Sequence, residues 1–295
     1  MKKLYFTISI DTEPDSSALP TYLLCRVAKE QVTTVLSGDG GDELFYGYNN
    51  IKCLIPLAAF DRIFPRFLRK GSMKILYALF GDTKPGLVGK ALSYDRYDEM
   101  YLISLDGFHR LYFDQLTGRN FDMEHSRIRE VYARLEKSVP KKFISAFLEQ
   151  SLYMPDDVLC KVDRASMACS LEVRPPILDH RVVEFANRLP HEYKYDRRTG
   201  GKLVLKKVLE RYVPRQLWDR PKQGFSPPVK KWLTCELKEE LCDLVSESNI
   251  QKEGFFRPEF ILQRMEDHLG GIKDNSNFLW SLFCWEKWRK NEESL

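Results

Sequence analysis

The 295-residue sequence contains no long apolar run and no pattern that a disulfide framework or a metal site requires. No segment approaches the roughly 20 apolar residues of a membrane-spanning helix. The seven cysteines lie far apart without a Cys-x-x-Cys pair, and the five histidines show no metal-ligand spacing. These absences argue against a membrane protein and a zinc site, and they predict reduced thiols in the cytoplasm.

A surplus of charge of either sign is also missing. Lysine and arginine number 46 against 42 aspartates and glutamates, a net charge of +4, and the basic residues are scattered. This distribution argues against a nucleic-acid partner, which would select a basic patch. By contrast, 43% of the residues are apolar and 13% aromatic, enough to bury a sizeable core in one large domain or two ordinary ones.

Strand signals are few and lie near the start of the chain. Alternating apolar residues predict a strand over 4–10, and apolar residues on one face predict a helix over 18–29. The β-branched, uncharged run 32–36 predicts a buried strand, so the three elements could form one right-handed βαβ unit. After them the pattern is mostly helical, and two strands cannot make a doubly wound sheet. We therefore expect the sheet to be incomplete within this chain.

An acidic, glycine-rich loop follows the run 32–36. Its members are Ser37, Gly38, Asp39, Gly40, Gly41, Asp42 and Glu43. The glycines permit positive φ and allow backbone amides to approach a phosphate closely. The acidic residues would repel a bare phosphate, so a phosphate ligand requires Mg²⁺ between them. An acidic surface turn is the alternative, but the position directly after a strand favours a ligand site.

Charged residues cluster again between residues 155 and 188. Pro155 and the two aspartates after it predict the start of a helix, residues 171–179 an extended segment, and residues 180–188 a further helix. The charged residues concerned are Lys161, Asp163, Arg164, Glu172 and Arg174. Their apolar surroundings predict buried ion pairs, which leaves an ion-paired scaffold and direct ligand contact both open.

Lys202 stands directly after two glycines, at the predicted start of a helix over 203–209. An anion at this position would also find free backbone amides. A solvated lysine is the ordinary alternative. The last 70 residues are helical by pattern and rich in aromatic residues, which predicts packing rather than chemistry.

Three stretches, 15–43, 161–179 and 201–225, together resemble the synthetase domain of glutamine-hydrolysing asparagine synthetases in order and spacing. The resemblance implies an α/β fold of the adenine-nucleotide α-hydrolase type, here a partial parallel sheet with a large, mostly helical remainder. It divides the synthetase domain over 1–295 into four parts. These are a nucleotide-site α/β part (1–50), a helical insert (51–150), the rest of the active-site shell (151–235) and C-terminal helices (236–295).

The resemblance also implies a reaction and residue roles. The side-chain carboxylate of aspartate attacks the α-phosphate of ATP, pyrophosphate leaves with Mg²⁺, and ammonia displaces AMP from the β-aspartyl adenylate. Asp39 would help to deprotonate the attacking amine, Lys202 would stabilise pyrophosphate and the transition state, and Asp42 would serve the Mg²⁺–pyrophosphate. Nucleotide contacts fall to Ser37, Gly38, Gly40 and Gly41, and a supporting shell to Glu43, Lys161, Asp163, Arg164, Glu172 and Arg174.

The sequence departs from the family at its start. It has no Ser-Gly-Gly-x-Asp-Ser stretch, and Lys2 rather than a cysteine follows Met1. We therefore expect a truncated or split form without the glutaminase domain and the first part of the sheet, in which residues 1–14 are foreign sequence. Such a chain would act as a homodimer or beside an N-terminal half that passes on ammonia from glutamine.

Two alternatives remain open. The first is the same adenylating chemistry on another carboxylate, in surface-polysaccharide or peptide synthesis. The second is a non-catalytic partner fragment. Adenylation across a panel of acids separates the first alternative from aspartate amidation.

Overall fold

The computed structural model describes residues 15–48, 71, 75–76, 78–79, 98–99, 101, 110–119, 122–140, 143–219 and 227–292. The predicted strand over 4–10 and most of the predicted helical insert lie outside these residues. The first described elements are α1 (Ala18–Lys29), β1 (Thr34–Leu36), α2 (Gly41–Phe45), α7 (Arg110–Thr117), α8 (Arg127–Leu135) and α9 (Ile144–Leu148).

The remaining elements alternate short helices with two small sheets before a helical C-terminal part. They are the π-helix η2 (Glu149–Leu159), α10 (Cys160–Met167), β2 (Glu172–Arg174), the 3₁₀ turn η3 (Pro176–Leu178), α11 (His180–Arg188), η4 (His191–Tyr193), β3 (Tyr195–Asp196), β4 (Gly200–Gly201), α12 (Leu203–Leu209) and η5 (Arg215–Leu217). The C-terminal helices are α13 (Val229–Thr234), α14 (Lys238–Leu244), α15 (Glu247–Glu253), α16 (Pro258–Leu269) and α17 (Ser276–Glu292).

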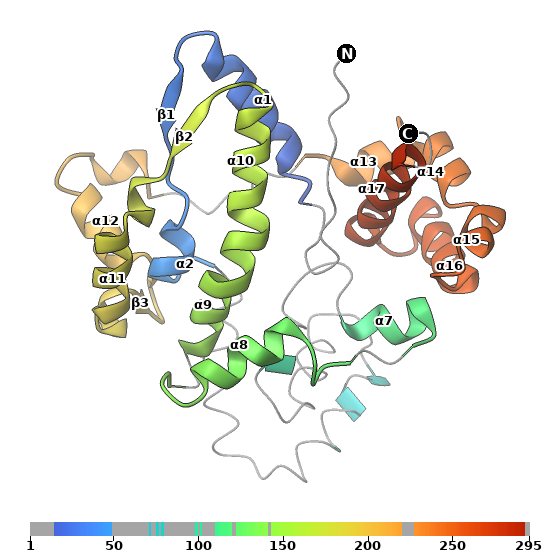
Figure 1. Cartoon of the computed structure of the whole chain (residues 1–295), viewed down its shortest axis with the longest axis horizontal. Helices are drawn as coiled ribbons and strands as arrows, with labels where there is room; N and C mark the ends of the chain where they lie inside the picture. Colours follow the sequence, from blue (N-terminus) through green and yellow to red (C-terminus); the bar gives the residue numbers. More distant parts are fainter. Residues whose placement is uncertain are drawn as a thin grey trace.

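The helix predicted over 18–29 is confirmed as α1. Pro20 lies in its first turn, where its missing N–H is not needed. Ala18 and Cys25 are buried, and the helix lies alongside α10 (Figure 1). None of the helices in the described part of the chain combines the length and the apolar content needed to cross a bilayer.

The strand predicted over 32–36 is present as β1, but the prediction that it is buried is wrong. β1 pairs in parallel with β2, with Val35 opposite Val173. Leu36 is 73% exposed and Val32 43%. Parallel sheets are ordinarily covered on both faces. Within the described residues β2 is the one strand that pairs with β1, and the exposure of Leu36 shows that part of the surface of β1 faces solvent.

Pro155 lies inside a continuous helix, so the prediction that it begins one is wrong. The helix runs through α9, η2 and α10 without a break (Figure 1). Proline has no N–H to donate and its ring crowds the preceding turn, so a regular α-helix would be interrupted there. The wider π-helical turns of η2 accommodate it.

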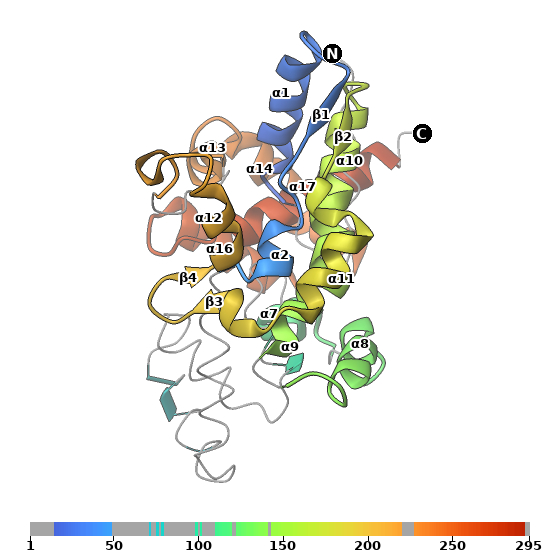
Figure 2. The same cartoon turned by 90° about the vertical axis from the view of Figure 1, so that its left-hand side faces the viewer.

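A small apolar cluster packs around α2, the helix that follows the glycine-rich loop. Leu44, Phe45 and Ala186 are buried, and partly buried residues of η3 and α12 pack against them. Figure 2 shows α2 between α11 and α12, with the hairpin β3–β4 beneath it. Tyr195 of the hairpin pairs antiparallel with Gly201, which immediately precedes Lys202. The fold thus brings the start of α12 to the loop.

The C-terminal helices pack around a common core, as their aromatic residues predict, and Leu116 of α7 also belongs to it. Buried residues of α13, α14, α16 and α17 form one cluster, including Leu233, Leu241, Ile261 and Leu279. Trp280 stacks on Phe283 within it, with ring centroids 5.8 Å apart. The helices at 180–188 and 203–209 are likewise confirmed, as α11 and α12.

Candidate functional site

The glycine-rich loop connects the carboxyl end of β1 to the start of α2. The amide of Ser37 donates to the carbonyl of Arg174 at 3.0 Å, which fixes the start of the loop to β2. Gly40 caps α2 with φ of 86°, a left-handed conformation that favours glycine. The Ser37 hydroxyl oxygen is buried and has no hydrogen-bond partner among the described residues. The loop therefore presents an unused donor at the edge where α/β sheets bind ligands.

Asp42 and Lys202 meet at this loop although they lie far apart in the sequence. Asp42 Oδ2 and Lys202 Nζ are 2.9 Å apart, and both side chains are partly exposed. The Lys202 amide donates to the carbonyl of Phe45 at 2.7 Å, and Lys202 has a positive φ of 62°. A β-carbon on Gly41 would lie 4.0 Å from Lys202 Nζ. The structure thus brings together one carboxylate, one cation and the glycine backbone.

Asp39 and Gly38 lie in the same loop, ahead of this pair. Asp39 is half-buried and Gly38 is exposed. A β-carbon at Gly38 would have no atom within 4 Å, so a ligand could approach the backbone here. Among the described residues no group of three or more His, Cys, Asp or Glu side chains could hold a metal ion. A magnesium ion at this loop would therefore be held by the Asp42 carboxylate together with phosphate oxygens and water, the usual ligands of Mg²⁺ beside a nucleotide.

The carboxyl group of Glu43, unlike that of Asp42, is buried in the protein. It is 1% exposed, and its Oε1 accepts from the Tyr48 hydroxyl at 2.5 Å. Gln150 of η2 donates to the Glu43 carbonyl at 3.2 Å. Burial raises the pKa of the Glu43 carboxyl, against the opposing effect of the Tyr48 hydrogen bond. Glu43 thus joins α2 to the long helix. Nothing in the sequence pattern marks Tyr48 or Gln150 as a partner of Glu43.

Lys161 joins α10 to the start of α1 instead of contacting the loop. Its Nζ donates to Asp15 Oδ2 at 2.5 Å and to Ser17 Oγ at 3.0 Å. Burial works to raise the pKa of Asp15, but the charge and hydrogen bond of Lys161 outweigh it and the pKa is lowered. Asp157 lies in the same cluster, where burial and the charge of Asp15 raise its pKa to about 6.

Four of the predicted supporting residues are exposed, so the prediction that they form buried ion pairs is wrong. Asp163 and Arg164 lie on the exposed side of α10. Glu172 and Arg174 do pair, at 2.8 Å, but with side chains 54% and 66% exposed. They occupy alternate positions of β2, and residues two apart in a strand share a face. That face is open to solvent.

Replacing Lys161 with methionine should lower the free energy of unfolding by about 2 kcal/mol, because Asp15 would lose its compensating cation in a mostly buried site. The lowered pKa of Asp15 also means that its contribution is lost as pH falls below about 4. Urea unfolding at pH 7 and pH 3 measures both effects, with the exposed Lys207→Met as control. Equal destabilisation by the two variants would contradict this role.

The contribution of Asp157 to the free energy of unfolding should change with pH in the opposite direction to that of Asp15, and Asp157→Asn tests this. A carboxyl whose pKa is raised to about 6 favours folding while protonated, so its contribution is lost as pH rises from about 4 to about 6. We expect the variant to match the wild type at pH 4 and to be about 1–2 kcal/mol more stable at pH 8. Thermal unfolding across this range is the measurement. Equal unfolding temperatures of the wild type and Asp157→Asn above pH 6 would exclude this pH-dependent contribution of Asp157.

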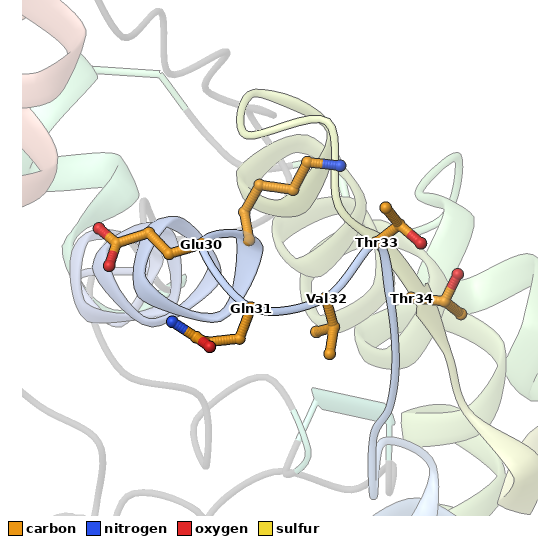
Figure 3. A pocket seen from close by; sticks show the side chains of 6 residues that line it. Glu30, Gln31, Val32, Thr33 and Thr34 are labelled. Atoms are coloured by element: carbon orange, nitrogen blue, oxygen red, sulfur yellow. The ribbon is translucent and has the colours of Figure 1, made fainter.

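A hollow of about 460 Å³ lies at the other end of β1. It is lined by Lys29, Glu30, Gln31, Val32, Thr33 and Thr34, which belong to the turn between α1 and β1 (Figure 3). Ligands of parallel sheets bind at the carboxyl ends of strands. This hollow lies at the amino end of β1, so the geometry favours the glycine-rich loop as the site of chemistry.

The chain is similar to known proteins over most of its length. A family model described as "Asparagine synthase" matches residues 6–290, so the expectation that all of residues 1–14 are foreign sequence is wrong. "Asparagine synthetase (glutamine-hydrolyzing) 1" of Bacillus subtilis is 30% identical over 94% of this chain and 43% of its own length. "Amidase chry2" of Gibberella zeae is 22% identical over 82% of this chain and 39% of its own length. The chain thus spans less than half the length of these curated relatives. No solved structure matches it.

Proposed function

Because this chain belongs to the asparagine synthase family, a family of carbon–nitrogen ligases, we propose that it binds Mg²⁺–ATP and supports pyrophosphate departure during amidation of aspartate. The observation that carries the proposal is the contact of Asp42 with Lys202 at the glycine-rich loop, 2.9 Å apart. The pair lies at the carboxyl end of β1, where a nucleotide would meet the free backbone of the loop.

Each part of the loop has a task in this proposal. Ser37 and the glycines would hold phosphate oxygens, and Asp42 would hold Mg²⁺, which neutralises charge on the departing pyrophosphate. Lys202, already held beside Asp42, would donate to pyrophosphate oxygens as negative charge develops. Donors fixed in place before the reaction stabilise such charge without reorganisation. Asp39 would accept a proton from the attacking ammonia.

The activity requires, in our proposal, polypeptide beyond this chain. The described sheet that carries the loop has two strands, and β1 leaves Leu36 and Val32 exposed. The chain also spans 43% of the length of the Bacillus subtilis relative. An N-terminal half supplying further strands and ammonia, or a second copy of this chain, would cover this surface. A non-catalytic partner role is the alternative that the open sheet favours.

Carboxylate-dependent exchange of labelled pyrophosphate into ATP tests the proposal. The assay uses purified chain with Mg²⁺ and a panel of acids including aspartate, sugar acids and amino-acid derivatives. Exchange with aspartate supports asparagine synthesis, whereas exchange with another acid assigns the same chemistry to another substrate. The assay is repeated with the part of the Bacillus subtilis relative that this chain does not match added as a separate polypeptide. Absence of exchange from folded protein in both forms would contradict a catalytic role.

A further inference from the structure

Lys194 is fully buried, which is unusual for a lysine. Its side chain is 0% exposed, and burial lowers its pKa to about 8. Its Nζ has no hydrogen-bond partner among the described residues, and it lies over the ring of Tyr46 at 4.9 Å from the centroid. A desolvated ammonium group costs free energy that an aromatic face offsets only in part. Burial of the Lys194 ammonium group therefore has a net cost in folding free energy.

Tyr46, on which Lys194 rests, ends α2 in a strained conformation. It is fully buried and has a left-handed φ of 61°, which costs a non-glycine residue free energy. Its hydroxyl lies 2.7 Å from His191 Nδ1, and its ring stacks against Phe143 at 6.0 Å. The ring is thus held on several sides. The turn after α2 is kept in a conformation that the backbone alone would disfavour.

The backbone on either side of Lys202 contacts both of these residues. A β-carbon at Gly201 would overlap the carbonyl oxygen of Tyr46, so the two backbones are in close contact. On the other side, the Leu203 amide donates to the carbonyl of Lys194 at 3.2 Å. Lys194 therefore reaches α12 through its backbone and the end of α2 through its side chain. Lys202 lies between these two attachments.

We propose that Lys194 is a positioning residue that holds Lys202 in place for its contact with Asp42. Its side chain keeps the Tyr46 ring, and with it the Tyr46 carbonyl, against Gly201. Its carbonyl fixes the first turn of α12. Loss of the charge would free the Tyr46 turn and let the Lys202 amine move away from Asp42. The catalytic consequence of this role rests on the proposed function, whereas the placement of Lys202 does not.

Acylation of Lys202 measures its placement without any activity. The reagent is an N-hydroxysuccinimide ester used at low excess, and the modified residue is identified by mass spectrometry. Contact with Asp42 protects the amine, so Lys194→Met should be labelled at Lys202 about threefold faster than the wild type, the ratio expected for loss of a partly exposed ion pair. Lys206, on the same helix, is the internal control, and its labelling should not change.

The second experiment measures exchange of labelled pyrophosphate into ATP. It uses the form of the protein that catalyses this exchange, either the purified chain or the chain with the added polypeptide. Lys194→Met should lower kcat about tenfold with little change in the KM for the carboxylate. The reason is that a displaced Lys202 amine would lose its contact with pyrophosphate in the transition state. In a Lys202→Ala background the same substitution should have no further effect, since Lys194 acts through Lys202. If Lys194 acted independently of Lys202, the losses of kcat in the two single variants would instead multiply in the double variant.

Unchanged Lys202 labelling in folded Lys194→Met would overturn the proposal. If that variant does not fold, Lys194→Gln takes its place, and failure of both to fold would make Lys194 a purely structural residue. Absence of exchange in the wild type would count against the proposed function alone, because the labelling arm still decides the role of Lys194.

Discussion

Lys202→Ala should lower the rate of carboxylate-dependent ATP–pyrophosphate exchange at least about a hundredfold, the range found when one fixed donor is removed from a developing charge. The lysine is the described cation in contact with the loop carboxylate Asp42, at 2.9 Å. Because its contact with pyrophosphate would strengthen as the α-phosphate bond breaks, kcat should fall more than the KM for ATP rises.

The matched control is Lys206→Ala. Lys206 lies on the same helix one turn later, and its Nζ donates to the carbonyl of Thr199 at 3.4 Å, away from Asp42. Removing its charge changes the net charge of the protein equally, so a general electrostatic effect would appear in both variants. Exchange within about tenfold of the wild type in Lys202→Ala, about 1.4 kcal/mol of barrier, would exclude the proposed role.

Gly201→Ala should be among the most destabilising single substitutions in the described part of the chain. The added methyl group would overlap the carbonyl oxygen of Tyr46, a backbone atom that cannot rotate away. The hairpin β3–β4 would have to separate from α2, which we expect to cost about 3 kcal/mol of unfolding free energy. Lys202 would move with it, so Lys202 labelling should also increase.

Gly38→Ala is the control for this substitution. A β-carbon there has no atom within 4 Å, and its φ carries no left-handed strain, so stability should change by less than about 0.5 kcal/mol. Urea unfolding of the two variants gives the comparison. Similar unfolding free energies for Gly201→Ala and the wild type would contradict the close contact between Gly201 and Tyr46.

Local patterns predicted the helices and the loop well because their causes are local. Apolar spacing identified α1, the ranges 180–188 and 203–209 agree with α11 and α12, and glycine content identified the loop at 37–43. Residue types also indicated that Lys202 begins a helix beside two glycines. Its contact with Asp42 depends on the fold and could be expected only from the family resemblance.

Burial was predicted less well, because it depends on which elements cover a segment. The apolar run 32–36 looks like a buried strand, yet Leu36 is 73% exposed, because pairing with β2 covers an edge of β1 and not the face from which this side chain projects. Glu172 and Arg174 were expected in the interior for the same reason. Lys194 shows the opposite error, since nothing in its sequence neighbourhood distinguishes a fully buried lysine from a solvated one.

In our proposal, Lys202 and the glycine-rich loop form the site for the phosphates of Mg²⁺–ATP. Protection of Lys202 from acylation is the measurement of choice, because it requires binding but no turnover. With Mg²⁺ and pyrophosphate or ATP present, labelling of Lys202 should fall several-fold while labelling of Lys206 stays constant. Equal labelling of Lys202 with and without saturating Mg²⁺–ATP and Mg²⁺–pyrophosphate would contradict the account.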